Sequence, residues 1–334
     1  MENNLGASYE AGQHVSENTI EVSNLTKYYN SRFSIAGRTF GQTVRGTENV
    51  SFIVQRGEIF GFLGPNGAGK TTTIRSMLGY LHPQSGTITI LGMDHAGDAM
   101  KIRERIGYIP GDLALYRNYT GEELINFFHK LRPMDKAMMT ELKRMFKVNL
   151  SQKVKKLSSG NRQQLALILA VGSNPELLIM DEPTSGLDPL MVSRFHALLR
   201  RLSRAGTTIF LSSHDLAEVQ AVCDRVGIIR NGIMVEVETV EALRHKAVQH
   251  MTLQFEDNED TRTEEVINEL KTHADVRTAD NGVMNLTIKG DVNEVIRLIS
   301  RTRVKRMTLE DAPLEDIFLQ YYMDESELKE VNGT

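Results

Sequence analysis

Alternating apolar and polar residues near the start of the chain predict two strands. The alternation runs through Thr19–Tyr29 and returns in Glu48–Val54, with a polar stretch between them. We expect an exposed hairpin or loop over Asn30–Gly46. The pattern of Gly57–Leu78 then predicts an apolar strand, a glycine-rich loop and a helix, and that of Thr87–Met93 predicts a further strand. This region is therefore predicted to have the order strand, loop, helix, strand.

The middle of the chain is predicted to be a helical segment followed by a parallel sheet. From Gly121 to about Val154, apolar residues recur at three- and four-residue spacing, as they do on one face of a helix. Two strands with long apolar runs follow, at Leu177–Pro183 and Thr207–Asp215, and helical sequence comes after each. This alternation indicates an α/β fold with parallel strands.

Beyond about Thr239 the pattern changes to that of a small α+β domain. Between Met251 and Leu309 the order is strand, helix, strand, strand, helix, strand, a split βαβ arrangement of the ferredoxin-like kind. The predicted organisation is a disordered leader over 1–18, an α/β domain over 19–240 with a helical subdomain at about 112–156, an accessory α+β domain over 241–323 and a tail over 324–334.

Composition excludes several other classes of protein. Of the 334 residues, 40% are hydrophobic and 25% charged, which is ordinary for a globular protein, and the net charge of -4 gives no broad cationic field for nucleic acid. Cys223 is the only cysteine, so an intrachain disulfide is excluded and a reducing compartment is expected. The N-terminus does not resemble a signal peptide, and the most apolar window, Leu165–Met180, is interrupted at Asn174–Glu176. Any membrane crossing is therefore expected in another polypeptide.

The glycine-rich loop carries the most specific motif. It fits G-x-x-x-x-G-K-[ST], with a strand before it and a helix after it. In such a loop, backbone N–H groups surround phosphate oxygens, the lysine reaches the β and γ phosphates, and the first threonine offers its hydroxyl to Mg²⁺. A glycine-rich turn without function is a remote alternative. The predicted binding residues are Gly64, Pro65, Asn66, Gly67, Ala68, Gly69, Lys70, Thr71 and Thr72.

Two carboxylates end the strand that starts at Leu177. Asp181 and Glu182 would lie at the carboxyl edge of the sheet, where α/β sheets bind ligands. Asp181 would then hold the metal, through water, and Glu182 would polarise the attacking water. An acidic pair at a strand end is also common on solvated surfaces, so this interpretation depends on the nearby phosphate loop.

A resemblance to one family becomes specific at Leu157-Ser-Ser-Gly-Asn161, which is followed by Arg-Gln-Gln. This segment is similar to the Leu-Ser-Gly-Gly-Gln signature of ATP-binding cassette (ABC) ATPases and departs from it at the third and fifth positions. The resemblance implies that Ser158 and Gly160 contact the γ-phosphate held by the opposite subunit. Ser158 can equally be the N-cap of the apolar helix that follows, and both roles are compatible.

Further motifs occur in the order of the same family. Ser185–Asp188 resembles the D-loop, so Asp188 is expected near the nucleotide, and His214 resembles the histidine that senses the γ-phosphate. Tyr29 resembles the aromatic residue that stacks on adenine, with Tyr28 as the alternative and an ordinary strand end as the competing interpretation. The resemblance covers residues 20 to 240, and Pro313–Tyr322 is similar to tails of the exporter branch with separate permeases.

The chain also departs from the family pattern at one functional position. Where the family has a glutamine that touches the metal, this chain has Gly111 followed by Asp112. Asp112 is either a substitute oxygen ligand or a residue that caps the turn after Pro110. The polar insertion between Ser31 and Gln42 is longer than usual.

The resemblance implies an ATP-hydrolysing, Mg²⁺-dependent subunit that works on the inner face of the membrane. Its expected partners are a second nucleotide-binding subunit and an integral-membrane permease, with export as the direction. The apolar residues of the helical subdomain are either a permease surface or a core stripe. They are Phe127, Phe128, Met138, Met139 and Met145. The alternative is an ABC-type ATPase that acts on nucleic acid or ribosomes, although no coiled coil or zinc module supports it.

Overall fold

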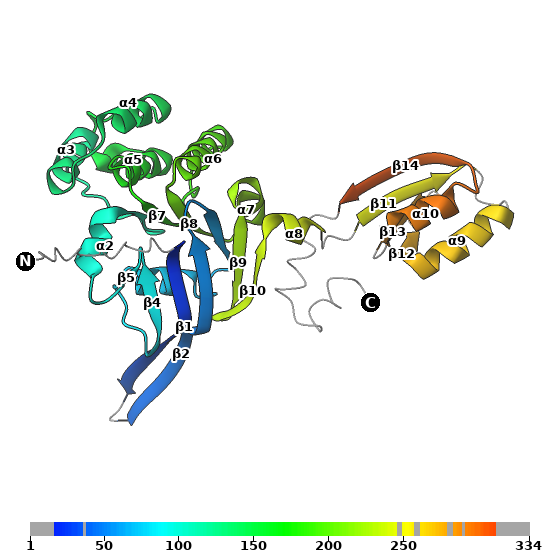
Figure 1. The fold of residues 1–334 in the computed structure, drawn as a ribbon, viewed down its shortest axis with the longest axis horizontal. Coiled ribbons are helices and arrows are strands. Elements are labelled where there is room, and N and C mark those ends of the chain that lie inside the picture. Colours follow the sequence, from blue (N-terminus) through cyan, green and yellow to red (C-terminus); the bar gives the residue numbers. More distant parts are fainter. Residues whose placement is uncertain are drawn as a thin grey trace, which may run out of the picture. The chain divides into compact units, whose positions relative to one another are not determined.

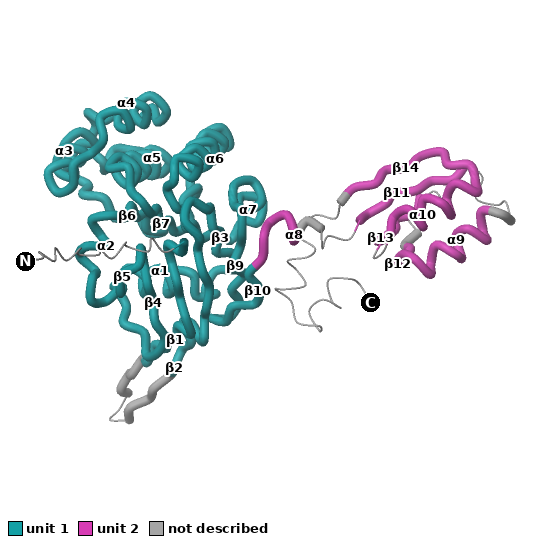
Figure 2. Tube along the Cα trace, viewed as in Figure 1, with its two compact units in different colours: residues 1–237 teal, residues 238–334 magenta. Residues whose placement is uncertain are grey.

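The computed structural model describes residues 17–35, 38–245, 249–256, 261–278, 283–288 and 291–311. The chain divides into two compact units, Met1–Val237 and Glu238–Thr334 (Figures 1 and 2). The expected tail at 324–334, the segment Pro313–Tyr322 and the leader up to residue 16 lie outside the described residues.

A six-stranded sheet forms the centre of the first unit. Its strands lie in the order β10 (Ile233–Thr239), β9 (Arg225–Arg230), β3 (Ile59–Leu63), β8 (Thr208–Ser213), β7 (Leu177–Asp181) and β6 (Ile106–Ile109). The pairs from β9 to β6 are parallel. Strands β3, β7 and β8 are buried along their whole length, which explains their continuous apolar runs. Parallel strands that are neighbours end at the same edge, so the loops after β3, β8 and β7 lie together.

The first strands of the chain form a separate sheet. Its order is β2 (Arg38–Gln55), β1 (Asn18–Ile35), β4 (Ser85–Ile90) and β5 (Met93–Asp94), with antiparallel pairing. The alternating pattern predicted these strands but did not reveal that they form a second sheet. Pairing of β1 with β2 continues from Asn30 opposite Thr43 to Ile35 opposite Arg38. The expected insertion is therefore a hairpin extension of both strands.

A cluster of phenylalanine rings joins the two sheets. Phe52 of β2 packs against Phe60, Phe62 and Phe210, with ring centroids 5.4 to 5.7 Å apart. Phe60 and Phe210 belong to neighbouring strands of the parallel sheet and stack at 5.9 Å. The cluster therefore packs the two sheets of the first unit against each other.

Most helices of the first unit begin where a side chain caps the free N–H groups of the first turn. The helices are α1 (Lys70–Met77), α2 (Ala99–Arg105), α3 (Gly121–Leu131), α4 (Lys136–Met145), α5 (Ser159–Val171), α6 (Pro189–Arg204) and α7 (Leu216–Val222). Side-chain caps start α3, α4, α5, α6 and α7, and Thr120 with Glu123 forms a full capping box on α3. Helices α3 and α4 gather at one end of this unit (Figure 1).

The second unit has a four-stranded antiparallel sheet. After α8 (Val240–His245) come β11 (Gln249–Phe255), α9 (Thr261–His273), β12 (Ala274–Thr278), β13 (Val283–Ile288), α10 (Val292–Ile299) and β14 (Val304–Asp311). The strand order β12-β13-β11-β14 follows the ferredoxin-like pattern. Met251, Leu253 and Phe255 of the inner strand β11 are buried with Leu270 of α9 and Val295 of α10.

Phe210→Ala tests the ring cluster. Phe210 is fully buried, so truncation should lower the free energy of unfolding of the first unit by about 3–5 kcal/mol through lost transfer free energy and a residual cavity. Ile53→Ala, on β2 beside Phe52 but 45% exposed, is the control and should change it by less than about 0.5 kcal/mol. Chemical unfolding curves of both variants give the comparison. Equal shifts for the two would contradict the central role of the cluster.

Candidate functional site

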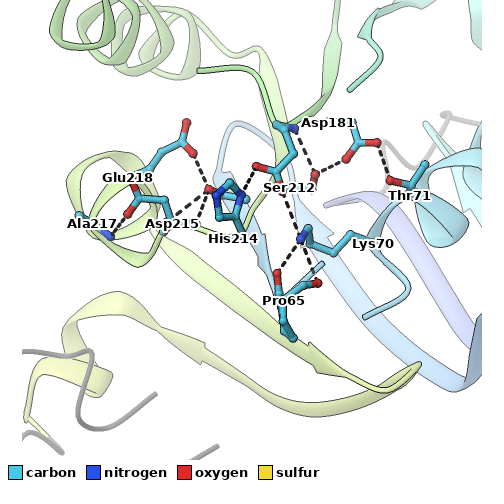
Figure 3. A network of polar contacts seen from close by, with 12 residues as sticks. Pro65, Lys70, Thr71, Asp181, Ser212, His214, Asp215, Ala217 and Glu218 are labelled. Carbon is cyan, nitrogen blue, oxygen red and sulfur yellow. Dashed lines mark hydrogen bonds and ion pairs between the residues drawn. The ribbon is translucent and has the colours of Figure 1, made fainter. Parts of the chain in front are cut away.

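The loop between β3 and α1 wraps around a buried lysine. Gly69 has a φ of +109°, and a Cβ there would lie 2.4 Å from the carbonyl oxygen of Gly46, so only glycine fits. Lys70 Nζ donates to the carbonyl oxygens of Gly64 at 2.6 Å and Pro65 at 3.3 Å (Figure 3). The predicted phosphate loop therefore folds around the ammonium group of Lys70, at the start of α1.

Two carboxylates meet this loop from β7. The buried carboxylate of Asp181 accepts from Thr71 Oγ1 at 2.8 Å through one oxygen and from Ser212 Oγ at 2.5 Å through the other. Glu182 has a φ of +50°, an uncommon conformation for a residue with a side chain. Its two oxygens contact Lys70 Nζ at 3.1 Å and His214 Nδ1 at 2.7 Å. Glu182 therefore links the phosphate loop to the loop after β8.

A cavity of about 570 Å³ connects these groups. Tyr29 lines it and its hydroxyl lies 3.1 Å from Thr72 Oγ1, whereas Tyr28 donates to Glu48 Oε1 at 2.6 Å. The two adjacent tyrosines point to opposite faces of β1, so Tyr29 rather than Tyr28 is placed for a bound base. The cavity is also lined by Arg45, Gly46, Asn66, Gly67, Arg75, Tyr108, Pro110, Gly111, Asp112, Ser185 and His214.

The signature-like residues and Asp188 are not among the residues that line this cavity. Ser158 Oγ accepts from Asn161 N at 3.2 Å and caps α5, while Asp188 Oδ1 accepts from Met191 N at 2.9 Å and caps α6. Gly160 lies so close to the loop after β7 that a Cβ there would be 2.6 Å from the Gly186 carbonyl oxygen. Within one chain, the site therefore brings together Tyr29, the phosphate loop, Asp181, Glu182 and His214, but not Ser158, Gly160 or Asp188.

Comparison with known proteins identifies the family. A family model described as ABC transporter matches residues 47–185. The chain is 32% identical over 307 residues to the uncharacterized ABC transporter ATP-binding protein YhcH of Bacillus subtilis (strain 168), across 90% of this chain and 95% of that protein. The chain belongs to the ABC transporter ATP-binding proteins. It is also 32% identical over 319 residues to the bacitracin transport ATP-binding protein BcrA of Bacillus licheniformis, across 90% of this chain and 96% of that protein.

Solved structures confirm the predicted fold class of this ABC ATPase. The ATP-binding subunit of an ABC transporter is 30% identical and aligns with a TM-score of 0.59, across 68% of this chain and 92% of that chain. The dimeric ABC transporter cassette MJ0796, bound to ADP and phosphate, has the same fold with a TM-score of 0.58 at 22% identity. The chain is an ATP-binding and ATP-hydrolysing enzyme of the ABC type.

The donor set beside the phosphate loop fits a magnesium ion that is bound together with nucleotide. Within the described ranges, no group of three or more His, Cys, Asp or Glu side chains could hold a metal alone. Thr71 and Asp181 instead offer one hydroxyl and one carboxylate, which suits Mg²⁺ because this ion takes few protein ligands and keeps water and phosphate oxygens. We therefore assign Thr71 and Asp181 as the residues that would hold it.

Gly111 lies directly beside this position. A Cβ on Gly111 would be 3.2 Å from Asp181 Oδ2, so the missing side chain brings the backbone of this loop close to the carboxylate. Asp112 lines the same cavity, and in the described part of the chain no hydrogen bond holds its carboxylate. No hydrogen bond therefore supports the interpretation that Asp112 caps the turn. Its place in the cavity, with Thr71 and Asp181, is compatible with the interpretation that it is a metal ligand.

Sequence reasoning missed three ionisable residues of the cavity, which are Arg45, Arg75 and Tyr108. Tyr108, at the end of β6, is half-buried, and burial together with the Asp181 carboxylate raises the pKa of its phenol to about 12. The hydroxyl therefore stays protonated at neutral pH and remains a hydrogen-bond donor. No motif contains Tyr108, because its position depends on the pairing of β6 with β7.

Asp112→Ala is expected to raise the Mg²⁺ concentration for half-maximal ATPase activity by about tenfold, the usual scale for a group that supports a metal site. The measurement is a Mg²⁺ titration at saturating ATP. Asp98→Ala serves as the control, because this aspartate pairs with Lys101 outside the cavity. If Asp112→Ala and the control titrate like the unmodified enzyme, Asp112 is not a ligand and Thr71, Asp181, phosphate oxygens and water form the metal's shell.

Proposed function

We propose that this chain is the ATP-hydrolysing subunit of an exporter whose membrane-spanning permease is a separate polypeptide. The observation that carries the hydrolytic part of the proposal is the position of Glu182, which contacts both the phosphate-loop lysine and His214 in the cavity. Relatives named for bacitracin transport and probable multidrug transport support export. No helix in the described segments is long and apolar enough to cross a membrane.

Hydrolysis requires a base, a phosphate clamp and a group that reads the γ-phosphate. Lys70 and the amides of the phosphate loop would hold the β and γ phosphates, and Tyr29 would stack on adenine. Glu182 would polarise the attacking water, and His214 would orient Glu182 and that water. Bound Mg²⁺ would neutralise charge on the phosphate oxygens.

A second copy, or a related subunit, would complete each site. Ser158, Gly160 and Asp188 lie outside the cavity of their own chain, as expected if they act on nucleotide held by the opposite subunit. The capping bonds of Ser158 with α5 and of Asp188 with α6 hold the two loops in shape. The dimeric cassettes among the solved neighbours support this arrangement.

The alternative of action on nucleic acid or ribosomes has less support. The relatives that this chain covers almost completely carry the names of transporter subunits. The acidic net charge of -4 also provides no field that would attract a phosphate backbone.

We assign permease docking to a groove between the parallel sheet and the helical subdomain. The groove has a volume of about 360 Å³ and is mainly apolar. Its walls combine residues around β6 and Pro110 with residues of α3 and α5. They include Ile106, Tyr108, Leu113, Leu115, Phe128, Met134, Ala166 and Leu169. The groove begins next to Gly111 and Asp112, so an inserted segment would touch the loop that borders the nucleotide site.

Of the five apolar residues predicted to form either a permease surface or a core stripe, only one lines this groove. Phe128 lines the groove, whereas Phe127 is exposed and meets Tyr116 edge to face with ring centroids 6.0 Å apart. The sulfur of Met139 lies against Gly172, which favours the core interpretation for that residue. Met138 and Met145 are half-buried and do not line the groove.

Glu182→Gln tests the catalytic assignment. The amide keeps the shape but loses the charge that polarises water, so kcat should fall by about 10²–10⁴-fold while nucleotide binding persists. Gel filtration with MgATP should show a trapped dimer. Glu176→Gln, just before the other end of β7 and outside the cavity, is the matched control and should keep normal turnover. A monomeric Glu182→Gln enzyme with full activity would overturn both the catalytic role and the dimer.

Leu115→Arg tests the groove. Arg103 and Arg132 also line the groove, but a further charge on its apolar wall cannot be desolvated without a partner, so the tagged variant should recover at least about tenfold less of one multispanning protein from detergent-solubilised membranes. ATPase activity without membranes should be unchanged. Ile233→Arg, on an exposed position of β10, is the control. Equal recovery of the same membrane protein by both variants would place the docking surface elsewhere.

A further inference from the structure

Two arginines lie in the wall of the apolar groove between the parallel sheet and the helical subdomain. Arg103 belongs to α2 and is exposed, whereas Arg132 directly follows α3 and is half-buried. Among the described residues that line the groove, no other carries a charge. These two side chains therefore determine the charge that an inserted segment meets.

Neither arginine has a carboxylate partner among the described residues. Arg103 Nη2 donates to the Leu78 carbonyl oxygen at 3.2 Å, and its guanidinium lies over the Tyr80 ring, 5.4 Å from the centroid. Arg132 Nη1 donates to the Ile106 carbonyl oxygen at 2.6 Å. A guanidinium has several N–H donors, so a single backbone carbonyl leaves each of these two cations able to bind an anion.

A third arginine nearby provides the contrast. Arg105, at the end of α2, donates from Nε and Nη2 to the two oxygens of Glu176 at 2.6 Å each, and it does not line the groove. Glu176 also acts electrostatically on Arg132, but both of its oxygens already accept from Arg105. The fold therefore neutralises the arginine outside the groove with a bidentate pair and leaves the two inside it without one.

An occupant that covers this groove must satisfy both charges. A guanidinium that loses water without gaining an opposite charge destabilises the complex, whereas one that meets a carboxylate forms short, charge-assisted hydrogen bonds. The uncharged walls require apolar side chains beside that carboxylate. Because the groove has a volume of about 360 Å³, a partner can insert a short segment but not a folded domain.

We propose that the groove receives an acidic amphipathic segment of the permease, whose Asp or Glu side chains pair with Arg103 and Arg132 while its apolar side chains fill the rest. The proposal rests on the proposed function, which assigns this groove to a separate permease. The Tyr80 ring and two backbone carbonyls already hold the guanidiniums, so less side-chain entropy is lost when a carboxylate binds. The pairing also gives specificity, because a neutral or basic segment would leave both charges buried and unpaired.

The first test replaces one charge by an apolar side chain of similar length. Arg103→Met in the full-length tagged chain should recover about 10- to 100-fold less of the multispanning protein from detergent-solubilised membranes, because a carboxylate of the partner is left unpaired. A purely apolar occupant would give the opposite sign, since methionine removes the cost of desolvating a charge and extends the apolar wall. Arg105→Met is the matched control outside the groove and should recover as much as the unmodified chain.

The second test detects the carboxylate of the partner directly. Arg103→Lys keeps the positive charge and introduces an amine, which a carbodiimide joins as an amide to a carboxylate in contact with it. After this treatment of the detergent extract, mass spectrometry should find the peptide that contains position 103 joined through Asp or Glu to the same multispanning protein. In the unmodified chain, Lys101 pairs with Asp98 outside the groove and should give no such link.

Different results would overturn this proposal and the proposed function. Recovery by Arg103→Met that equals or exceeds that of the unmodified chain would show that no carboxylate meets Arg103. If Arg103→Met does not fold, Arg103→Lys decides: recovery of the membrane protein without a link at position 103 refutes the pairing. A link to this chain's own residues 313–322, which contain Glu315 and Asp316, would assign the groove to the chain itself. An unmodified chain that recovers no multispanning protein would instead refute the proposed function on which the pairing rests.

Discussion

The buried ammonium group of Lys70 is the constraint on which the site depends. A buried charge is tolerated only where acceptors and an opposite charge surround it. The carbonyl oxygens of Gly64 and Pro65 supply the acceptors, and Glu182 supplies the charge. The loop can provide these carbonyls only by curling tightly around the amine, and that curl requires the glycine at position 69. The same geometry that satisfies the lysine leaves it facing the place where phosphates would bind.

Strand order brings the other partners to this point. Loops after β3, β8 and β7 are far apart in sequence but leave neighbouring strands at one edge of the sheet. The buried phenylalanine cluster holds the second sheet, and with it Tyr29, against the same edge. Packing beneath the loops thus determines the distances between groups in the cavity. Opposite charges pair Lys70 with Glu182, and hydrogen bonds from the hydroxyls of Thr71 and Ser212 hold Asp181.

The sequence predicted those features that depend on a short segment. The phosphate loop follows from local spacing, the ends of β7 and β8 from apolar runs, and the capping role of Ser158 from its place before an apolar helix. It did not predict the separate antiparallel sheet, because alternation predicts a strand but not its partner. Tyr108 was missed for a related reason: it matters through its neighbours on another strand, and it stands in no motif. Gly111 was recognised as a departure, but its closeness to Asp181 needed the structure.

The loop after β7 has contacts on two sides that make it a natural link between the two halves of a dimeric site. On one side Glu182 contacts His214, which would read the γ-phosphate in its own chain. On the other, Gly160 of the signature-like loop lies against the Gly186 carbonyl with no room for a side chain, and Gln163 of α5 donates to the Pro183 carbonyl oxygen at 2.7 Å. Close-packed contacts of this kind leave little room for independent movement. A shift of the loop caused at His214 would therefore also move the residues that face the opposite subunit's nucleotide. If Gly160 acts on nucleotide held by an opposite subunit, as proposed above, its tight fit on Gly186 would couple the two sites.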